Sequence, residues 1–221
     1  MTTLTATPVA PLLDRLFVEA DMASPEMTAE FAAMDRNDVD RLMRSKTTYR
    51  AFYERLKDFP LPVSREGGRL LYMLARGCGA KTIVEFGTSF GISTVHLAAA
   101  LRDNGGGHLI TSEFEPSKVV RATANLMAAG LADLVEIREG DALQTLAIDM
   151  PERIDLLLLD GAKALYADIL DLVEHALRPG AFVIADNADY SPDYLARVRD
   201  PANGYLSVSF GEDIEVSMRI A

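Results

Sequence analysis

Residues 82–91 read Thr82-Ile83-Val84-Glu85-Phe86-Gly87-Thr88-Ser89-Phe90-Gly91. The first five form a short apolar run with β-branched and aromatic side chains, which is typical of a strand. Two glycines spaced four residues apart follow, and residues 92–102 continue as an alanine- and leucine-rich helical stretch. The stretch therefore predicts a strand that turns tightly into a helix, the repeating unit of α/β proteins.

The same alternation continues along the chain. Apolar runs at 108–113, 134–138, 154–160 and 181–186 alternate with helical stretches at 116–129, 141–147 and 165–177. This order predicts an α/β fold with a doubly wound, mostly parallel sheet and right-handed crossovers. Two further runs, 205–210 and 214–220, are separated only by Gly211-Glu212-Asp213 and predict a C-terminal antiparallel hairpin. The expected strands number seven.

The first part of the chain has a different pattern. We expect residues 1–61 to form an N-terminal helical cap and residues 62–221 to form the α/β domain. Helical apolar spacing begins near residue 11, and a second helix is expected to begin with Ser24 as N-cap and Pro25 in its first turn. Charged residues interleaved with apolar ones at 35–58 predict amphipathic helices. Such helices would form either a lid over a site or the interface of a homodimer.

Composition narrows the classes of protein. A length of 221 residues suits one sizeable domain, and a formal net charge of −11 disfavours binding to a phosphate backbone. Cys78 is the single cysteine, so no internal disulfide forms, which fits a reducing compartment. No apolar run of about 18 residues and no signal-like start occur, so we expect a cytoplasmic protein without a membrane span.

Ligands of doubly wound sheets bind at the carboxyl ends of the strands. The loop with Gly87 and Gly91 lacks the glycine spacing of a dinucleotide-binding loop, so no pyrophosphate is indicated. Glu113 ends the next strand, where a carboxylate accepts hydrogen bonds from ribose hydroxyls. Together these features predict a nucleoside ligand without phosphate. The alternative for the glycines alone is a tight turn that binds nothing.

Three more polar residues follow the fourth and fifth expected strands. Asp160, Asp186 and Asn187 offer carboxylate and amide oxygens, which suit a hard divalent cation such as Mg²⁺. The alternative is that each caps a helix or forms a turn. Lys163 follows Asp160 by three residues and is a candidate general base if its pKa is lowered beside a metal. The alternative for Lys163 is a solvated surface side chain.

Four segments together resemble a known family. They are Val63 to Leu71, Glu85 to Ser93 with the strand end at Glu113, Leu159-Asp160-Gly161-Ala162-Lys163, and Ala185-Asp186-Asn187. In this order they look like the cation-dependent class I O-methyltransferases, which include catechol and caffeoyl-coenzyme A O-methyltransferases. The resemblance covers residues 62–221 and implies a Rossmann-like fold, S-adenosylmethionine as cofactor and Mg²⁺ or another divalent cation.

The resemblance also implies a role for each matching residue. The cofactor would be bound by Val63, Glu85, Gly87, Ser93, Glu113, Asp141, Ala142 and Asp160. The metal would be held by Asp160, Asp186 and Asn187, and the substrate would meet Lys163, Asn187 and Glu215. Asp160 and Lys163 would be catalytic, with Lys163 taking the proton of the attacking hydroxyl.

The expected reaction is transfer of a methyl group from S-adenosylmethionine to a hydroxyl of a small, catechol-like molecule. Two alternatives stay open: an O-methyltransferase acting on a modified uridine of transfer RNA, and a non-catalytic S-adenosylmethionine-binding protein. Two departures from the family concern the substrate side. The segment Asp160-Gly161-Ala162-Lys163 lacks a second acid, and the chain has no tryptophan to form the aromatic gate of catechol O-methyltransferase. Tyr166, Tyr190 and Tyr194 are candidates for that gate.

Overall fold

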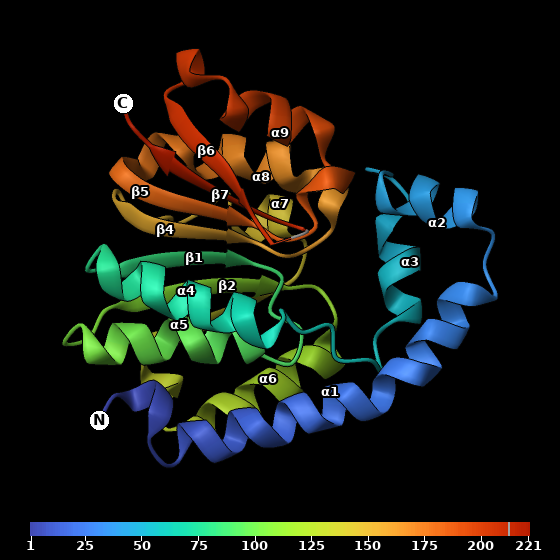
Figure 1. Cartoon of the computed structure of the whole chain (residues 1–221), viewed down its shortest axis with the longest axis horizontal. Helices are drawn as coiled ribbons and strands as arrows, with labels where there is room; N and C mark the ends of the chain where they lie inside the picture. Colours follow the sequence, from blue (N-terminus) through green and yellow to red (C-terminus); the bar gives the residue numbers. More distant parts are fainter. Residues whose placement is uncertain (212) are drawn as a thin grey trace.

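The computed structural model describes residues 1–211 and 213–221. Within them, seven strands form one sheet in the order β3-β2-β1-β4-β5-β7-β6, with helices on both faces (Figure 1). The strands are β1 (Thr82–Phe86), β2 (His108–Glu113), β3 (Val135–Glu139), β4 (Ile154–Leu159), β5 (Leu177–Ala185), β6 (Tyr205–Phe210) and β7 (Ile214–Arg219). The predicted doubly wound, mostly parallel sheet is therefore confirmed.

The topology defines where a ligand can reach the sheet. Strands β1 to β5 pair in parallel, and the chain builds outward from β1 to β3 before it returns to add β4 and β5 on the other side. The switch point lies between β1 and β4, where crossover connections diverge and leave a crevice. The antiparallel hairpin of β6 and β7 closes the far edge, with β7 beside β5.

The two faces of the sheet bury separate apolar clusters. Alternate strand residues point to opposite faces, so Ile83 and Leu109 belong to one cluster while Val84 and Ile110 belong to the other. The first cluster lies under helices that follow β1 and β2, and the second under helices that follow β3 to β5. The helices of the α/β part are α4 (Arg65–Gly77), α5 (Ile92–Asp103), α6 (Pro116–Ala129), α7 (Ala142–Thr145), α8 (Tyr166–Val173) and α9 (Pro192–Arg199).

After a short 3-10 helix (Thr3–Thr5), the N-terminal segment continues as one long helix, α1 (Val9–Ala32). The expected helix start at Ser24 is wrong, because α1 continues through Pro25. Proline removes the hydrogen bond to the carbonyl four residues earlier, and here that carbonyl belongs to exposed Asp21, where water can bind it. The first half of α1 packs into the apolar cluster of α4 to α6, with Leu16 and Phe17 buried.

Two short helices, α2 (Arg36–Met43) and α3 (Tyr49–Arg55), follow α1. In Figure 1 they stand beside the body, on the side where the chain leaves the carboxyl ends of β1, β2 and β4. None of the described helices is long and apolar enough to cross a membrane.

One buried carboxylate ties the start of β4 to its neighbours. Asp155 is 5% exposed and accepts hydrogen bonds from the amides of Lys81 and Thr82, at 2.8 and 3.0 Å, and from Nε of Arg178 at 2.5 Å. Burial by itself would raise the pKa of Asp155. The hydrogen bonds from Arg178 and the two amides outweigh burial, so the pKa lies below its ordinary value.

We expect Asp155→Asn to lower the free energy of unfolding by about 2 kcal/mol at neutral pH, since it weakens three charge-assisted hydrogen bonds. A depressed carboxyl pKa stabilises the fold above the ordinary value of about 4, and this stabilisation is lost as pH falls through the folded value. Urea unfolding at pH 7 and pH 3 should therefore show a difference between variant and parent that shrinks with acid. A constant difference, or an equal effect of Asn at exposed Asp58, would contradict this role.

Candidate functional site

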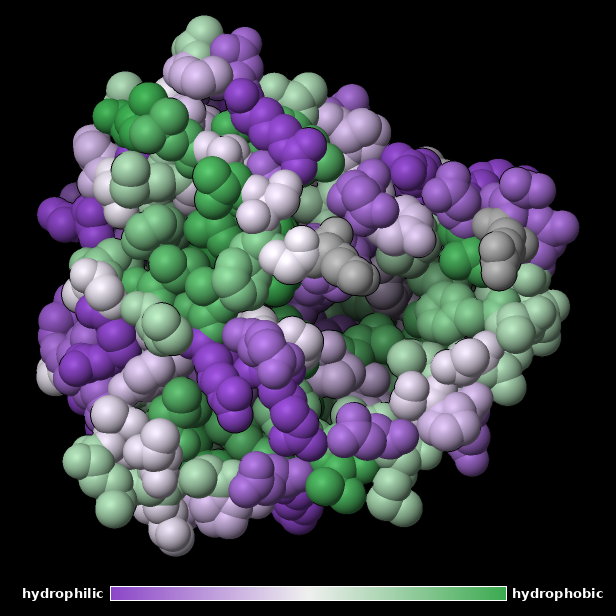
Figure 2. Space-filling model, viewed as in Figure 1, coloured by the Kyte–Doolittle hydropathy of each residue, from purple (hydrophilic) through white to green (hydrophobic). Residues whose placement is uncertain are grey.

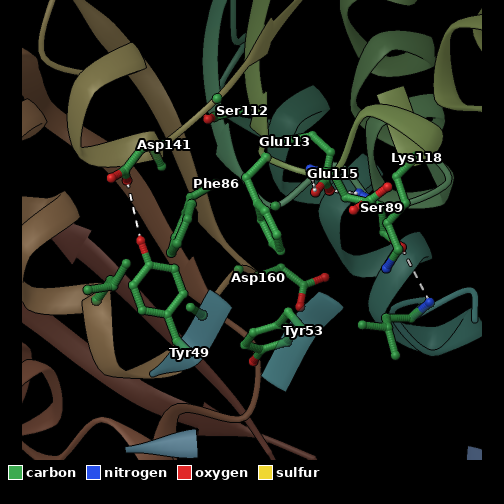
Figure 3. A pocket seen from close by; sticks show the side chains of 18 residues that line it. Tyr49, Tyr53, Phe86, Ser89, Ser112, Glu113, Glu115, Lys118, Asp141 and Asp160 are labelled. Carbon is green, nitrogen blue, oxygen red and sulfur yellow. Dashed lines mark hydrogen bonds between the residues drawn. The ribbon is translucent and has the colours of Figure 1, made fainter. Parts of the chain in front are cut away.

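The main cavity lies at the switch point and spans about 650 Å³, including space open to solvent. Segments that follow β1, β2, β3 and β4 line it, together with α3 and α6, as Figure 3 shows from close by. Figure 2 shows the surface hollowed where α2 and α3 meet the rest of the molecule. A concave site with a few polar groups among apolar walls is typical of a small-molecule site.

Backbone geometry brings the first loop against the end of β4. Gly87 has φ +99°, and an added Cβ there would lie 2.6 Å from the carbonyl oxygen of Asp160. The amide of Asp160 donates to the carbonyl of Phe86 at 2.8 Å. Position 87 must therefore be glycine for two reasons, its positive φ and the contact with Asp160.

Glu113 borders the main cavity at the end of β2. Its carboxylate accepts the amides of Ser89, at 2.8 Å, and Glu115, at 3.0 Å, and the residue is 7% exposed. Each carboxylate oxygen has a further lone pair, because an ionised carboxylate offers about four acceptor sites. Glu113 is thus oriented by the backbone and can still accept hydrogen bonds from a ligand.

Asp141 and Ala142 border the cavity after β3. Asp141 accepts the amide of Leu143 at 3.1 Å and so caps α7. It also accepts from Oη of Tyr49 at 3.4 Å, drawn dashed in Figure 3, and from Nη2 of Arg50 at 2.5 Å. Helix α3 is therefore connected to the strand-end segments across the mouth of the cavity.

Glu85 and Ser93 lie deeper than the main cavity. Glu85 is fully buried and accepts hydrogen bonds from Oγ of Ser93 and Oγ1 of Thr94, both at 2.6 Å. Burial raises the pKa of Glu85 to about 7, although both hydroxyl groups oppose the rise. Ser93 lines an adjoining cavity between residues 60–62 and 87–93, which also touches Asp160.

Lys163 lies between two carboxylates. Its Nζ is 3.0 Å from Oδ1 of Asp160 and 3.4 Å from Oδ2 of Asp186, and the lysine is 5% exposed. Burial alone would lower the Lys163 pKa, but surrounding groups that include both carboxylates hold it well above its ordinary value. Burial in turn raises the pKa of Asp160 despite the nearby ammonium group. Lys163 is therefore a buried cation here, not a solvated surface lysine.

A third cavity, which we call the acidic cavity, spans about 790 Å³, including space open to solvent, and is lined in part by Asp21, Val63, Asp186, Asn187 and Asp213. Asn187 has φ +48°, a backbone conformation that asparagine tolerates, and its Nδ2 donates to Oδ2 of Asp213 at 3.2 Å. No three His, Cys, Asp or Glu side chains among residues 1–211 and 213–221 are arranged to hold a metal. The candidate set from the sequence comprises two carboxylates and one amide, with Asp160 and Asp186 converging on Lys163.

The structure does not bring Glu215 to these cavities. Its carboxylate is 2% exposed and accepts from Arg199 at 2.9 and 2.7 Å and from Oγ of Ser207 at 2.5 Å. Asp213, two residues earlier in the β6–β7 turn, lies beside Asn187 instead. The two residues differ because Glu215 lies on β7, where its side chain must point to one face of the sheet. Asp213 lies in the turn before β7, which extends beyond the edge of the sheet.

Several lining residues were not predicted from the sequence. Tyr49 and Tyr53 lie four positions apart, so they share one face of α3 and both line the main cavity. Phe114, between β2 and α6, and Lys118, in the first turn of α6, also line it. The charge-rich, amphipathic pattern at 35–58 was the available signal for the tyrosines, but it did not reveal which surface they cover.

The proposed gate tyrosines occupy other places. Tyr166 and Tyr194 are fully buried, and Oη of Tyr166 donates to the carbonyl of Asp186 at 2.7 Å. Tyr190 lies under the guanidinium of Arg44, with 5.5 Å between the Cζ atom and the ring centroid. The expectation that Tyr166 or Tyr194 forms a gate is therefore wrong, since neither ring reaches a surface.

Comparison with known proteins identifies the fold independently. Residues 84–188 match the family model of a methyltransferase domain. A catechol O-methyltransferase of Niastella koreensis is 37% identical over 130 residues, which are 58% of this chain and 58% of that protein. Catechol O-methyltransferase B of Danio rerio is 33% identical over 170 residues, 73% of this chain and 63% of its own length. The chain thus spans about three fifths of these curated relatives.

Solved structures match over more of the chain. The O-methyltransferase TomG of Streptomyces achromogenes, solved with S-adenosylmethionine, superposes with a TM-score of 0.68 at 25% identity over 89% of this chain and 96% of that one. An O-methyltransferase of Bacillus cereus superposes with a TM-score of 0.66 at 21% identity over 90% of this chain and 97% of that one, which supports the fold.

We expect Glu85→Gln to stabilise the ligand-free chain increasingly as pH rises. A folded carboxyl pKa near 7 lies above the unfolded value of about 4.3, so the contribution of Glu85 is fully present below the unfolded value and is lost as pH rises through 7. The advantage of the variant should grow between pH 5 and pH 8, by on the order of 2 to 3 kcal/mol. Urea unfolding across this range measures it, with exposed Glu152→Gln as control. Parallel curves for Glu85→Gln and its parent would refute the assignment.

Proposed function

We propose that this chain transfers the methyl group of S-adenosylmethionine to a hydroxyl of a small acceptor, because residues 84–188 match the family model of a methyltransferase domain. One arrangement carries the proposal. The main cavity has the carboxylate of Glu113 on one wall and Asp160 on another, and Asp160 is shared with the buried Lys163 and Asp186. A cofactor site and a proton-transfer site therefore meet at one residue.

The side chains that line the cavity suit S-adenosylmethionine in their chemistry. Glu113 would accept the ribose hydroxyls, the segment from Asp141 to Ala142 would border the adenine, and the loop from Gly87 to Ser93 would lie along the methionine part. The carboxylates of Glu113 and Asp160 also favour a ligand with a positive centre. When bound, the cofactor supplies a methyl group on a sulfonium sulfur.

A hard divalent cation fits the oxygen ligands of Asp160, Asp186 and Asn187. The two carboxylates already converge on a positive group, the ammonium of Lys163. The cation would supply charge that lowers the pKa of a coordinated hydroxyl, and two adjacent oxygens on the acceptor would permit chelation. We therefore propose a catechol-like acceptor in the acidic cavity, where Asp186 and Asn187 line the wall.

The residues of the chain would then position the acceptor and move one proton. Lys163 is held between Asp160 and Asp186. A cation that shared the charge of these carboxylates would lower the pKa of Lys163, and the neutral amine, after losing its own proton to solvent, would take the proton of the acceptor hydroxyl. Oη of Tyr166 donates to the main-chain carbonyl of Asp186 and so helps to hold Asp186 in position. Burial of this cluster excludes water and strengthens each electrostatic contact.

We further propose that residues 1–61 act as a cap, with α2 and α3 as the part that covers the cofactor. Two ion pairs join this part to the body, Lys46 to Asp168 at 2.6 Å and Arg50 to Asp141 at 2.5 Å. Both basic side chains are about half exposed, so each pair contributes little by itself and is weakened by salt. Such a cap can open to exchange the cofactor.

The decisive experiment has two stages. Calorimetry should detect S-adenosylmethionine binding to the purified chain, and a methyl-transfer assay with catechol should then be run with Mg²⁺ and with excess chelator. Binding followed by Mg²⁺-dependent turnover supports the proposal. Absence of binding would overturn the cofactor, and full turnover in chelator would overturn the metal.

We expect Asp186→Asn to reduce kcat/KM for catechol by roughly 10²- to 10³-fold, since it removes charge where the cation and the acceptor meet. The affinity for S-adenosylhomocysteine should change little, because Asp186 lines the acidic cavity and not the main one. Steady-state kinetics and calorimetry measure the two quantities. If kcat/KM and the affinity for S-adenosylhomocysteine fell together, Asp186 would not act on the methyl acceptor alone.

We expect the double variant Lys46→Ala with Arg50→Ala to release S-adenosylhomocysteine severalfold faster than the parent. The two ion pairs are worth roughly 0.2 to 1 kcal/mol each, and their loss should also make release insensitive to NaCl. Stopped-flow fluorescence at 50 and 500 mM NaCl measures both effects. Arg55→Ala is the matched control, because Arg55 pairs with Glu30 inside the N-terminal segment. Unchanged release in the double variant would show that α2 and α3 do not retain the cofactor.

A further inference from the structure

Lys118 is a buried cation that the proposed reaction does not use. It lies in the first half of α6, is 5% exposed and lines the main cavity (Figure 3). The ring centroid of Phe90 is 5.9 Å from its Nζ. Lysine is rarely buried without a partner, because an ammonium group loses strong hydration there.

The chain itself satisfies this ammonium incompletely. Among the described residues, its one hydrogen-bond acceptor is Oγ of Ser89, at 3.4 Å, and the carboxylates of Glu113 and Glu115 act on it without a hydrogen bond. Burial lowers the pKa of Lys118, while the more distant carboxylates of Glu113 and Glu115 oppose that shift. An ammonium group has three donors, so Lys118 can donate to at least one further acceptor in the cavity.

The position of Lys118 indicates which ligand atoms could supply that acceptor. Ser89 joins Lys118 to Glu113, since the Ser89 hydroxyl meets the ammonium and the Ser89 amide donates to the Glu113 carboxylate at 2.8 Å. Lys118 lines the main cavity, where the nucleoside is placed by the proposed function. It does not line the adjoining cavity of residues 60–62 and 87–93, where the methionine part is placed.

We propose that Lys118 donates a hydrogen bond to a ribose hydroxyl oxygen of the bound cofactor, while Glu113 accepts from the ribose hydroxyls. A hydroxyl group donates one hydrogen bond and accepts others, so it can satisfy an ammonium and a carboxylate together. The pair would recognise a ribonucleoside over a deoxyribonucleoside. This inference rests on the proposed function, because it requires S-adenosylmethionine in the main cavity.

The test compares ligands that differ by one oxygen. Adenosine, 2′-deoxyadenosine, 3′-deoxyadenosine, 5′-methylthioadenosine and S-adenosylhomocysteine are titrated calorimetrically into the parent and into Lys118→Met. Methionine fills a similar volume without a donor. We expect the variant to bind adenosine, 5′-methylthioadenosine and S-adenosylhomocysteine about tenfold more weakly, equivalent to about 1.4 kcal/mol. For the deoxynucleoside that lacks the contacted oxygen, variant and parent should bind alike.

Two further variants distinguish loss of the hydrogen bond of Lys118 from loss of its charge, and thermal unfolding tests whether the variants fold. Lys57→Met removes an exposed lysine near Glu115 that does not line the cavity, and it should leave all five affinities unchanged. Lys118→Gln keeps a donor without the charge and should lose less affinity for adenosine than Lys118→Met. Thermal unfolding without ligand should show both Lys118 variants folded, since replacing a buried ammonium removes a desolvation cost.

Three results would overturn the inference. Equal weakening of adenosine and both deoxynucleosides would mean that no hydroxyl is contacted. Weakening for S-adenosylhomocysteine alone would move the contact to its carboxylate. Unchanged affinities would leave Lys118 with a purely structural role. If the parent chain binds none of the five ligands, the proposed function fails, and that outcome is distinct from any effect of Lys118.

Discussion

The backbones of Gly87 and Asp160 lie against each other, and the whole site depends on that contact. Strands β1 and β4 are neighbours in parallel register, with Phe86 opposite Leu159, so both chains leave the sheet at the same point. A side chain at position 87 would lie 2.6 Å from the Asp160 carbonyl oxygen. Because only glycine allows this approach, the loop along the proposed cofactor touches the segment that carries Asp160 and Lys163.

Burial then gives this small region its chemistry. Glu85, Lys118 and Lys163 are each at most 5% exposed, which is unusual for charged side chains. Hydroxyl groups of Ser93 and Thr94 satisfy Glu85, and carboxylates surround Lys163, whereas Lys118 has a single long hydrogen bond. Clusters of perturbed buried charges are typical of functional sites. The fold itself therefore satisfies Glu85 and Lys163, whereas Lys118 can still donate to a ligand.

The local sequence pattern predicted least well where solvent exposure or strand register determined the structure. Ser24 and Pro25 have the local features of a helix start, yet α1 continues through them. Asp21, whose carbonyl loses its helical hydrogen bond to Pro25, is exposed, so water can bind this carbonyl. The resemblance implied that Glu215 meets the substrate, but in the structure its carboxylate accepts from Arg199. Tyr49 and Lys118 carry no motif at all, and they reach the main cavity only because α3 and α6 pack around it.

The sequence by itself determined the order of strands and helices, the C-terminal hairpin and the positions of Glu113, Asp160, Asp186 and Asn187 at strand ends. These features follow from apolar periodicity and turn residues, which are local along the chain. The tertiary structure alone decided that Lys163 lies between Asp160 and Asp186, that α3 covers the cavity and that Glu215 is withdrawn. Each of these is a contact between distant segments, and such contacts depend on how strands pair and helices pack.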